Sequence, residues 1–223
     1  YMYKLSIIIA TFNEEKTISK LLDQLRFSND IILVDGGSTD NTIKIASEKN
    51  INIINCKKNR GLQFYNGAKA AKEDWLLFIH ADSILSKDCQ NSINKFIAKK
   101  NSAYVGWFNL SFDSDCISSK IISFWANKRS VIFSLPFGDQ GLLINSKNYN
   151  NLGGHPKIPI MEDIALIRKM EKKNIIPLGI DIVTSFKKYK KEGILIRGAK
   201  NLLCQTLYFL GFNTKILNKI YNI

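Results

Sequence analysis

The stretch DIILVDGG at residues 30–37 carries the pattern that decides the fold. Its unbroken run of branched apolar residues is typical of a strand buried on both faces, and the glycine pair predicts a sharp turn directly after it. Similar strands are predicted at 5–10, 51–56 and 75–79. Segments with helical spacing separate them, so residues 1–100 are expected to form a mainly parallel, doubly wound α/β sheet with helices on both faces.

The second half of the chain has longer and more varied elements. We expect strands at 103–112, 141–144 and 178–185, helices at 117–133 and 162–173, a basic loop at 187–191, and helices in the remaining C-terminal segment. Neither an internal repeat nor a low-complexity linker interrupts the sequence. One main domain with a C-terminal helical appendage is therefore the expected organisation.

Composition limits the classes of function. The net charge is +13, but the chain is rich in Lys, Asn and Ile and carries neither an RNA-binding aromatic signature nor a Cys/His finger, so nucleic acid is not an expected partner. An anionic substrate or an acidic membrane surface fits the charge better. The four cysteines lie far apart, without metal-ligand or disulfide spacing. With no leader before the first strand and no run of 18 apolar residues, a cytoplasmic location is expected.

Polar and acidic residues follow three of the predicted strands, at the edge where open α/β sheets bind ligands. These ends read ATFNE at 10–14, DGGSTD at 35–40 and HADS at 80–83. Asp35 can bond a ribose or a base, or it can only cap its own turn. His80 and Asp82 share one side of an extended segment, so they can hold Mn²⁺ or Mg²⁺ against a diphosphate; the alternative is a capping aspartate beside a half-buried histidine.

Glu162 and Asp163 open the predicted helix at 162–173. Acidic residues in a first helical turn commonly only complement the helix dipole. Here they follow an irregular segment with a glycine pair at 153–154 and two prolines, and such ordered loops often carry function. His155 lies in the same segment, where a histidine satisfied within the loop is the favoured interpretation over a ligand.

Taken in order, these motifs resemble a family-two glycosyltransferase of the GT-A fold. The resemblance rests on SIIIATFNEE at 6–15, ILVDGGSTDNT at 32–42, NRG at 59–61 followed by NGA at 66–68, FIHADS at 78–83, and the acidic pair 162–163. His80 stands where the family has the first Asp of a metal-binding D-x-D, and Gly36 where it has a second Asp. Both changes are similar to a bacterial subgroup in which His-x-Asp is usual.

The resemblance implies a GT-A domain over 1–193, with a nucleotide-binding half (1–100) and an acceptor half (101–193), and a helical appendage over 194–223. It also implies an inverting hexosyl transfer from a nucleotide-diphosphate sugar, with Asp163 as the catalytic base. Asp82 and His80 would hold Mn²⁺ or Mg²⁺. The donor would contact Thr11, Asn13, Glu14, Asp35, Gly61, Asn66, Ala81 and Asp82, and the sugar or acceptor side would be lined by Asp139, Gln140 and Glu162.

Two other classes of function stay open at this point. A nucleotidyltransferase would share the sheet and the metal, but it would carry a glycine-rich phosphate loop with a Lys or Arg near the first strand, which this chain lacks. A non-catalytic nucleotide-sugar-binding or membrane-associated module is compatible with the altered D-x-D. The acceptor stays open and would be a lipid-linked molecule, a glycan or a small molecule. The basic, apolar segment 187–223 would either dock on an anionic inner membrane face or form a dimer face.

Overall fold

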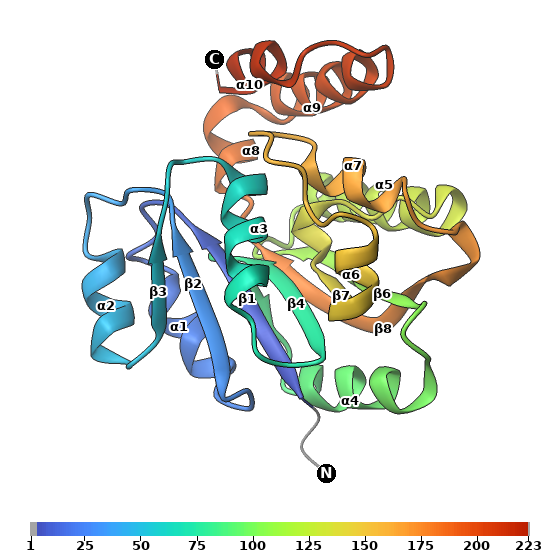
Figure 1. Cartoon of the computed structure of the whole chain (residues 1–223). Helices are drawn as coiled ribbons and strands as arrows, with labels where there is room; N and C mark the ends of the chain where they lie inside the picture. The colour runs from blue at the N-terminus through green and yellow to red at the C-terminus, as the bar shows by residue number, and fades with distance from the viewer. Residues whose placement is uncertain (1–3, 223) are drawn as a thin grey trace.

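The computed structural model describes residues 4–222, and its centre is an eight-stranded mixed sheet (Figure 1). Its strands are β1 (Leu5–Thr11), β2 (Asp30–Asp35), β3 (Asn52–Asn55), β4 (Trp75–His80), β5 (Ile84–Leu85), β6 (Val105–Phe112), β7 (Leu142–Asn145) and β8 (Ile175–Thr184). They lie in the order β3-β2-β1-β4-β7-β6-β8-β5. The first four strands are mutually parallel, as the buried apolar runs predict.

Helices cover both faces of this sheet, and further helices in the C-terminal segment lie beyond one of its ends (Figure 1). They are α1 (Ile18–Gln24), α2 (Thr42–Glu48), α3 (Arg60–Ala70), α4 (Cys89–Lys99), α5 (Ile117–Phe133), α6 (Ser146–Asn151), α7 (Glu162–Ile167), α8 (Lys187–Glu192), α9 (Ile194–Phe209) and α10 (Thr214–Asn222). One apolar cluster joins α1, α2 and α4 to Ile7, Ile9 and Leu33. The other joins α3, α6 and α7 to Ile8 and Val34 on the opposite face. Alternate side chains along these strands therefore point into the two cores in turn.

The second half of the sheet departs from the mainly parallel expectation. The pairings of β7 with β4, of β7 with β6 and of β5 with β8 are antiparallel. The first residue of β7, Leu142, lies opposite Phe78 near the carboxyl end of β4. Because β7 runs backwards, the loop that precedes it reaches the same edge as the ends of β1, β2 and β4, and this is the edge that matters for function.

Two predicted segments differ from the structure. The basic stretch 187–191, expected as a loop, lies within α8, where the ring of Tyr189 stacks on that of Phe186 with centroids 5.0 Å apart. The helix expected over 162–173 ends at Ile167, and a short 3₁₀ turn at Lys172–Asn174 leads into β8. The lysines that dominate 187–191 obscure the contact between Phe186 and Tyr189, and the apolar spacing of 162–173 continues past the residue where the helix ends.

The helical appendage packs on the body of the molecule. A third apolar cluster joins Cys204 of α9 and Leu217 of α10 to Ile160, Met161 and Ile164 at the start of α7. The two C-terminal helices lie over this region in Figure 1. Among the described residues, no helix is long and apolar enough to cross a membrane.

Gly67 gives a direct test of the packing between α3 and the sheet. A Cβ atom at this position would overlap Ile8 Cγ2 and would lie 2.9 Å from Val34 Cγ2. Both neighbours are stiff, β-branched core residues, so the backbone would have to move. We expect Gly67→Ala to lower the free energy of unfolding by roughly 1–3 kcal/mol, measured by denaturant titration.

The matched control is Gly198→Ala in α9, where an added Cβ meets nothing within 4 Å. It should leave stability unchanged or raise it by up to about 1 kcal/mol, because alanine favours the helix. Equal stabilities of Gly67→Ala and the wild type would contradict the packing described.

Candidate active site

A pocket of about 190 Å³ opens at the carboxyl edge of the sheet. Its wall is built from segments that follow β4, β6 and β8, from the loop before β7, from the start of α7, and from the C-terminal helices. Residues far apart in the sequence therefore meet where parallel α/β sheets bind their ligands. Of the predicted site residues, His80, Asp82, Asp139 and Asp163 all line this pocket.

Asp163 lies in the first turn of α7, with its carboxylate at the pocket wall. One oxygen accepts a hydrogen bond from the backbone N–H of Gly138, and the other accepts one from the N–H of Ile164 at 2.7 Å. The two bonds come from different segments, the loop before β7 and α7 itself. They hold the carboxylate in one orientation toward the pocket.

Glu162, the neighbour of Asp163, is completely buried and does not line the pocket. Both of its carboxylate oxygens accept from the guanidinium of Arg60, at the start of α3. Burial raises the pKa of the Glu162 carboxyl, and the charge of Arg60 opposes that rise. Arg60 itself reaches the pocket wall, so Glu162 contacts the site only through its partner.

The backbone at the start of α7 is held in an uncommon conformation. Met161, the residue before Glu162, has φ 64° and ψ 18°, in the left-handed region that non-glycine residues enter only at a cost. Its side chain is buried with Cys204 and Leu217 of the C-terminal helices. This packing holds the turn that presents Asp163 to the pocket.

His80 and Asp82 both reach the pocket, and the imidazole is poised as a ligand. The Nε2 atom of His80 is buried and has no hydrogen-bond partner among the described residues. Burial and the charge of Arg60 hold the pKa of His80 well below its ordinary value, so the ring is neutral at pH 7, the form that binds metals. The Asp82 carboxylate accepts a long bond, 3.3 Å, from the Thr184 hydroxyl.

These residues fit a divalent cation that the substrate helps to hold. Asp139 adds a second unpartnered buried atom, Oδ1, and burial raises the pKa of its carboxyl to about 6. Within residues 4–222, however, no three His, Cys, Asp or Glu side chains lie close enough to form a complete metal site. A cation bound by one imidazole and one carboxylate would need oxygens from a diphosphate and water, which is how Mg²⁺ and Mn²⁺ commonly bind nucleotides.

Gly138 separates the candidate base from the candidate ligand. A Cβ atom at this position would lie 2.9 Å from His80 Nε2 and 3.1 Å from Asp163 Oδ2. The two functional groups thus face each other across a space about as wide as one methyl group. Only glycine leaves that space open.

The residues predicted to hold the nucleoside gather at the ends of β1 and β2, beside the pocket but not in its wall. Asn13 accepts from Thr39 N at 2.8 Å and donates its own N–H to Ser38 Oγ at 2.8 Å. Asp35 is fully buried and accepts from Gly37 N and Ser38 N, each at 2.7 Å. Its carboxylate therefore caps its own turn, which is one of the two roles expected for it.

Thr11 and Glu14 complete the same corner of the site. Thr11 Oγ1 is buried and has no partner among the described residues. The pKa of the Glu14 carboxyl is raised by burial and by the nearby charge of Asp82, so Glu14 lies between the β1 end and the pocket. The ends of β1, β2 and β4 are neighbours because β1 pairs in parallel with both other strands. The nucleoside roles of Thr11, Asn13, Glu14 and Asp35 stay predictions.

The other predicted contact residues have structural roles in this fold. Gly61 passes so close to the loop at 156–158 that a Cβ would overlap Pro156 O, and Asn66 lies near the Cys56 thiol. Ala81 is buried in the core, which leaves only its backbone for a ligand. Gln140 is fully buried, accepting from Ser130 Oγ at 2.6 Å. Their roles at the donor and acceptor remain predictions, and none of these four residues lines the pocket.

The sequence patterns missed the part of the wall that comes from the C-terminal helices. Arg197, Asn201 and Gln205 of α9 line the pocket, together with Lys188 of α8 and Tyr221 of α10. The signal was present, because the three α9 residues are polar and recur every fourth position on a mainly apolar helix. His155, by contrast, is satisfied inside its loop: it is buried, with Nδ1 3.0 Å from the Tyr149 hydroxyl.

Solved structures with the same fold are known. Glucosyl-3-phosphoglycerate synthase of Mycobacterium tuberculosis, in a complex with Mn²⁺, UDP and glucosyl-3-phosphoglycerate, aligns with a TM-score of 0.56 over 82% of this chain and 71% of that one. The sequences are 14% identical, so the likeness concerns the fold. It confirms the expected GT-A architecture, with the mixed rather than mainly parallel sheet described above.

Curated relatives match in sequence over a shorter region. An uncharacterized glycosyltransferase of Rickettsia typhi is 35% identical over 106 residues, which are 45% of this chain and 35% of the relative. The poly(ribitol-phosphate) beta-N-acetylglucosaminyltransferase TarS of Staphylococcus aureus is 30% identical over 116 residues, 45% of this chain and 20% of TarS. This chain thus matches only about a third or less of the length of these relatives.

The family profile covers most of the chain. The pattern described as Glycosyl transferase family 2 matches residues 6–162, from β1 to the first residue of α7. The match spans the three acidic strand ends and stops one residue before Asp163. The chain belongs to glycosyl transferase family 2.

Proposed function

We propose that this chain transfers a sugar from a nucleotide-diphosphate donor to an acceptor hydroxyl, with inversion at the anomeric carbon. The observation that carries the proposal is the convergence of Asp163, His80, Asp82 and Asp139 on one pocket at the carboxyl edge of the sheet. Membership of family 2 and the GT-A fold support it. A donor nucleotide fits the relatives, since the mycobacterial enzyme binds UDP.

In this proposal Asp163 is the general base. Its carboxylate accepts the proton of the acceptor hydroxyl while that oxygen forms a bond to the anomeric carbon and the bond from this carbon to the diphosphate oxygen breaks. The nucleoside diphosphate leaves with the bonding electrons. Bonds from Gly138 N and Ile164 N orient the carboxylate, so little reorganisation is needed when the acceptor arrives.

The leaving diphosphate needs positive charge near it. His80 and Asp82 would hold Mn²⁺ or Mg²⁺, which when bound would neutralise charge on the diphosphate. The ammonium of Lys188 lies in the same pocket, close enough to influence both His80 and Glu14, and makes no ion pair within the described residues. Arg60, paired with Glu162, also lines the pocket wall.

The nucleoside would lie along the ends of β1 and β2. Thr11 supports this, because its buried hydroxyl lacks a partner among the described residues and would gain one from a ligand. Asn13, Glu14 and Asp35 form the rest of the corner, while Gly61 and Asn66 would contribute by shaping α3 beside it. Backbone atoms of Ala81 and the carboxylate of Asp82 would continue the contact toward the diphosphate.

A panel of donors tests the proposal and its rivals. The full chain is screened by thermal shift against UDP-, GDP-, CDP- and dTDP-sugars with Mn²⁺, and the release of nucleoside diphosphate is then measured for each donor that binds. A transferase turns the donor over, slowly with water and faster with its acceptor. Binding without any turnover would instead favour the non-catalytic module, and release of pyrophosphate from a nucleoside triphosphate would favour the nucleotidyltransferase.

Asp163→Asn should abolish transfer and leave donor binding nearly intact. The amide keeps the size of the side chain but cannot accept the proton, so the rate should fall by roughly 10²–10⁴-fold. The measurement is the rate of nucleoside diphosphate release, alongside the thermal shift with the donor. Asp181→Asn, at an exposed position of β8, is the matched control and should behave like the wild type. Normal turnover by Asp163→Asn would show that another group is the base.

Asp82→Asn should weaken metal binding. With UDP present, we expect the Mn²⁺ affinity, followed by electron paramagnetic resonance, to fall at least about tenfold, because the carboxylate charge is lost. The control is Asp115→Asn, whose exposed carboxylate lies outside the pocket. If Asp82→Asn binds Mn²⁺ as tightly as the wild type, His80 and Asp82 do not form the metal site.

We also propose that the outer face of α9 rests on an anionic membrane surface, peripheral to the bilayer. This face exposes large apolar side chains, namely Leu195, Leu202 and Leu203, and the exposed Leu210 follows directly after the helix. Exposed lysines lie on the neighbouring helices α8 and α10, namely Lys190, Lys191, Lys215 and Lys219. Apolar side chains flanked by lysines match the boundary between acyl chains and anionic headgroups.

Leu195→Ser/Leu202→Ser should reduce co-sedimentation with vesicles that contain anionic lipid by roughly tenfold, since two leucines would no longer be buried. Ile117→Ser/Ile121→Ser, which changes two exposed isoleucines of α5, is the control and should sediment like the wild type. Equal sedimentation of both variants and the wild type would argue against membrane contact. If the wild type dimerises without lipid and Leu195→Ser/Leu202→Ser stays monomeric, this face is a homodimer interface instead.

A further inference from the structure

The pocket face of α9 carries polar residues on a helix that is mainly apolar. Arg197, Asn201 and Gln205 are four residues apart, so they form one stripe along the helix, and all three line the pocket. This wall lies outside residues 6–162, which the family profile covers. The family match therefore does not describe this wall.

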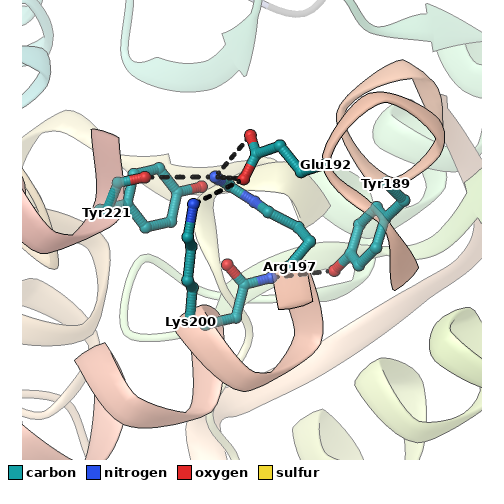
Figure 2. Close-up of polar contacts among 6 residues, drawn as sticks. Tyr189, Glu192, Arg197, Lys200 and Tyr221 are labelled. Carbon is teal, nitrogen blue, oxygen red and sulfur yellow. Dashed lines mark hydrogen bonds and ion pairs between the residues drawn. The ribbon is translucent and has the colours of Figure 1, made fainter. Parts of the chain in front are cut away.

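Arg197 holds the stripe in place. Its side chain is buried, pairs with Glu192 at 3.3 Å, donates to Tyr221 O at 3.3 Å and stacks over the Tyr221 ring at 3.9 Å. Lys200 reaches the same carboxylate at 3.1 Å. Figure 2 shows these side chains converging from α8, α9 and α10. Because Arg197 already has its partners, it fixes the three helices to one another.

Asn201 is different, because part of its amide has no partner within residues 4–222. Its Nδ2 donates to the Tyr189 hydroxyl at 2.9 Å, while its Oδ1 is buried with no hydrogen bond to any residue the structure describes. If the amide were turned over, Nδ2 would be the atom left alone, so one polar atom stays unsatisfied either way. A buried unpaired group of this kind is destabilising, and a ligand that bonded it would remove that penalty.

The surroundings of Asn201 indicate which ligand group would supply the bond. The same pocket is lined by the aromatic rings of Phe112, Phe137, Tyr189 and Tyr221. Apolar ring faces combined with a few well-placed polar atoms match a molecule that carries both C–H faces and hydroxyls. A carbohydrate or another polyol has this composition, whereas a simple alcohol has no second hydroxyl to reach Asn201.

The position of α9 assigns this group to the acceptor side. Cys204 of α9 packs in the cluster with Met161 and Ile164, which flank the pair containing Asp163. The predicted nucleoside corner lies at the ends of β1 and β2, with β4 between it and the second half of the sheet. A ligand touching α9 therefore lies on the side of the base, where the acceptor hydroxyl must be.

We infer that α9 forms an acceptor subsite for a polyhydroxylated group, in which a ligand hydroxyl donates to Asn201 Oδ1. The inference rests on the proposed transfer reaction, whose acceptor it narrows to a sugar or polyol. Asn201 determines specificity and takes no part in proton transfer. Tyr189 holds the amide, and Arg197 fixes α9 against α8 and α10.

Binding of small polyols tests the subsite without requiring turnover. The probes are ribitol, glycerol and the methyl glycosides of glucose, galactose and mannose, with n-butanol as the simple alcohol, each observed by saturation-transfer NMR on the full chain. We expect at least one polyol to bind and n-butanol not to bind. Asn201→Leu should lose at least about tenfold in affinity for that polyol, and Asn201→Asp, which keeps an acceptor oxygen for the ligand, should restore most of it.

Asn91→Leu, the same change at an exposed position of α4, is the matched control, and the thermal midpoints of all variants verify folding. With a donor that is turned over, Asn201→Leu should raise KM for the polyol by a larger factor than it lowers kcat. Equal polyol binding by the wild type and Asn201→Leu, or no polyol binding by the wild type, overturns the subsite. If polyol binding depends on Asn201 but the protein turns over no donor, the subsite is supported and the proposed transfer reaction is wrong.

Discussion

The site depends on the pairing of one buried carboxylate with one arginine. Glu162 is inaccessible to solvent, and a lone buried charge of this kind would be costly, so Arg60 must meet it. The pair ties the start of α3, in the first half of the chain, to the start of α7, in the second. Without Arg60, the Glu162 carboxylate would stay buried without this ion-pair partner, and the turn that carries Asp163 would lose its tie to α3.

The reversed strand β7 explains how the second half contributes to the site. In a wholly parallel sheet, the carboxyl edge receives loops only from strand ends. Because β7 is antiparallel to β4, its preceding loop arrives at this edge and brings Gly138 and Asp139 beside His80. The Gly138 amide then bonds Asp163, so the mixed topology links the base to the sheet.

The sequence allowed the acidic strand ends to be predicted because an apolar run followed by polar residues marks both a strand and its carboxyl end. His80 and Asp82 were therefore expected at this edge, whereas the role of Asp163 followed from the family resemblance; all three line one pocket. Glu162 and Gln140 were expected there too, but the pattern does not say which neighbour of Asp163 or Asp139 faces inward. Asn201 was missed because the sequence does not show that α9 lies over the pocket, and only this placement identifies its polar residues as part of the pocket wall.

Gly138 makes the reaction centre sensitive to the smallest change a side chain can undergo. A methyl group there would occupy the gap between His80 Nε2 and Asp163 Oδ2, which lie 2.9 Å and 3.1 Å from its position. The imidazole, the carboxylate or the loop backbone would have to shift to make room for the methyl group of an alanine. One added methyl group at Gly138 would therefore disturb the candidate base and the candidate metal ligand at the same time, which ties the two halves of the proposed chemistry to a single backbone position.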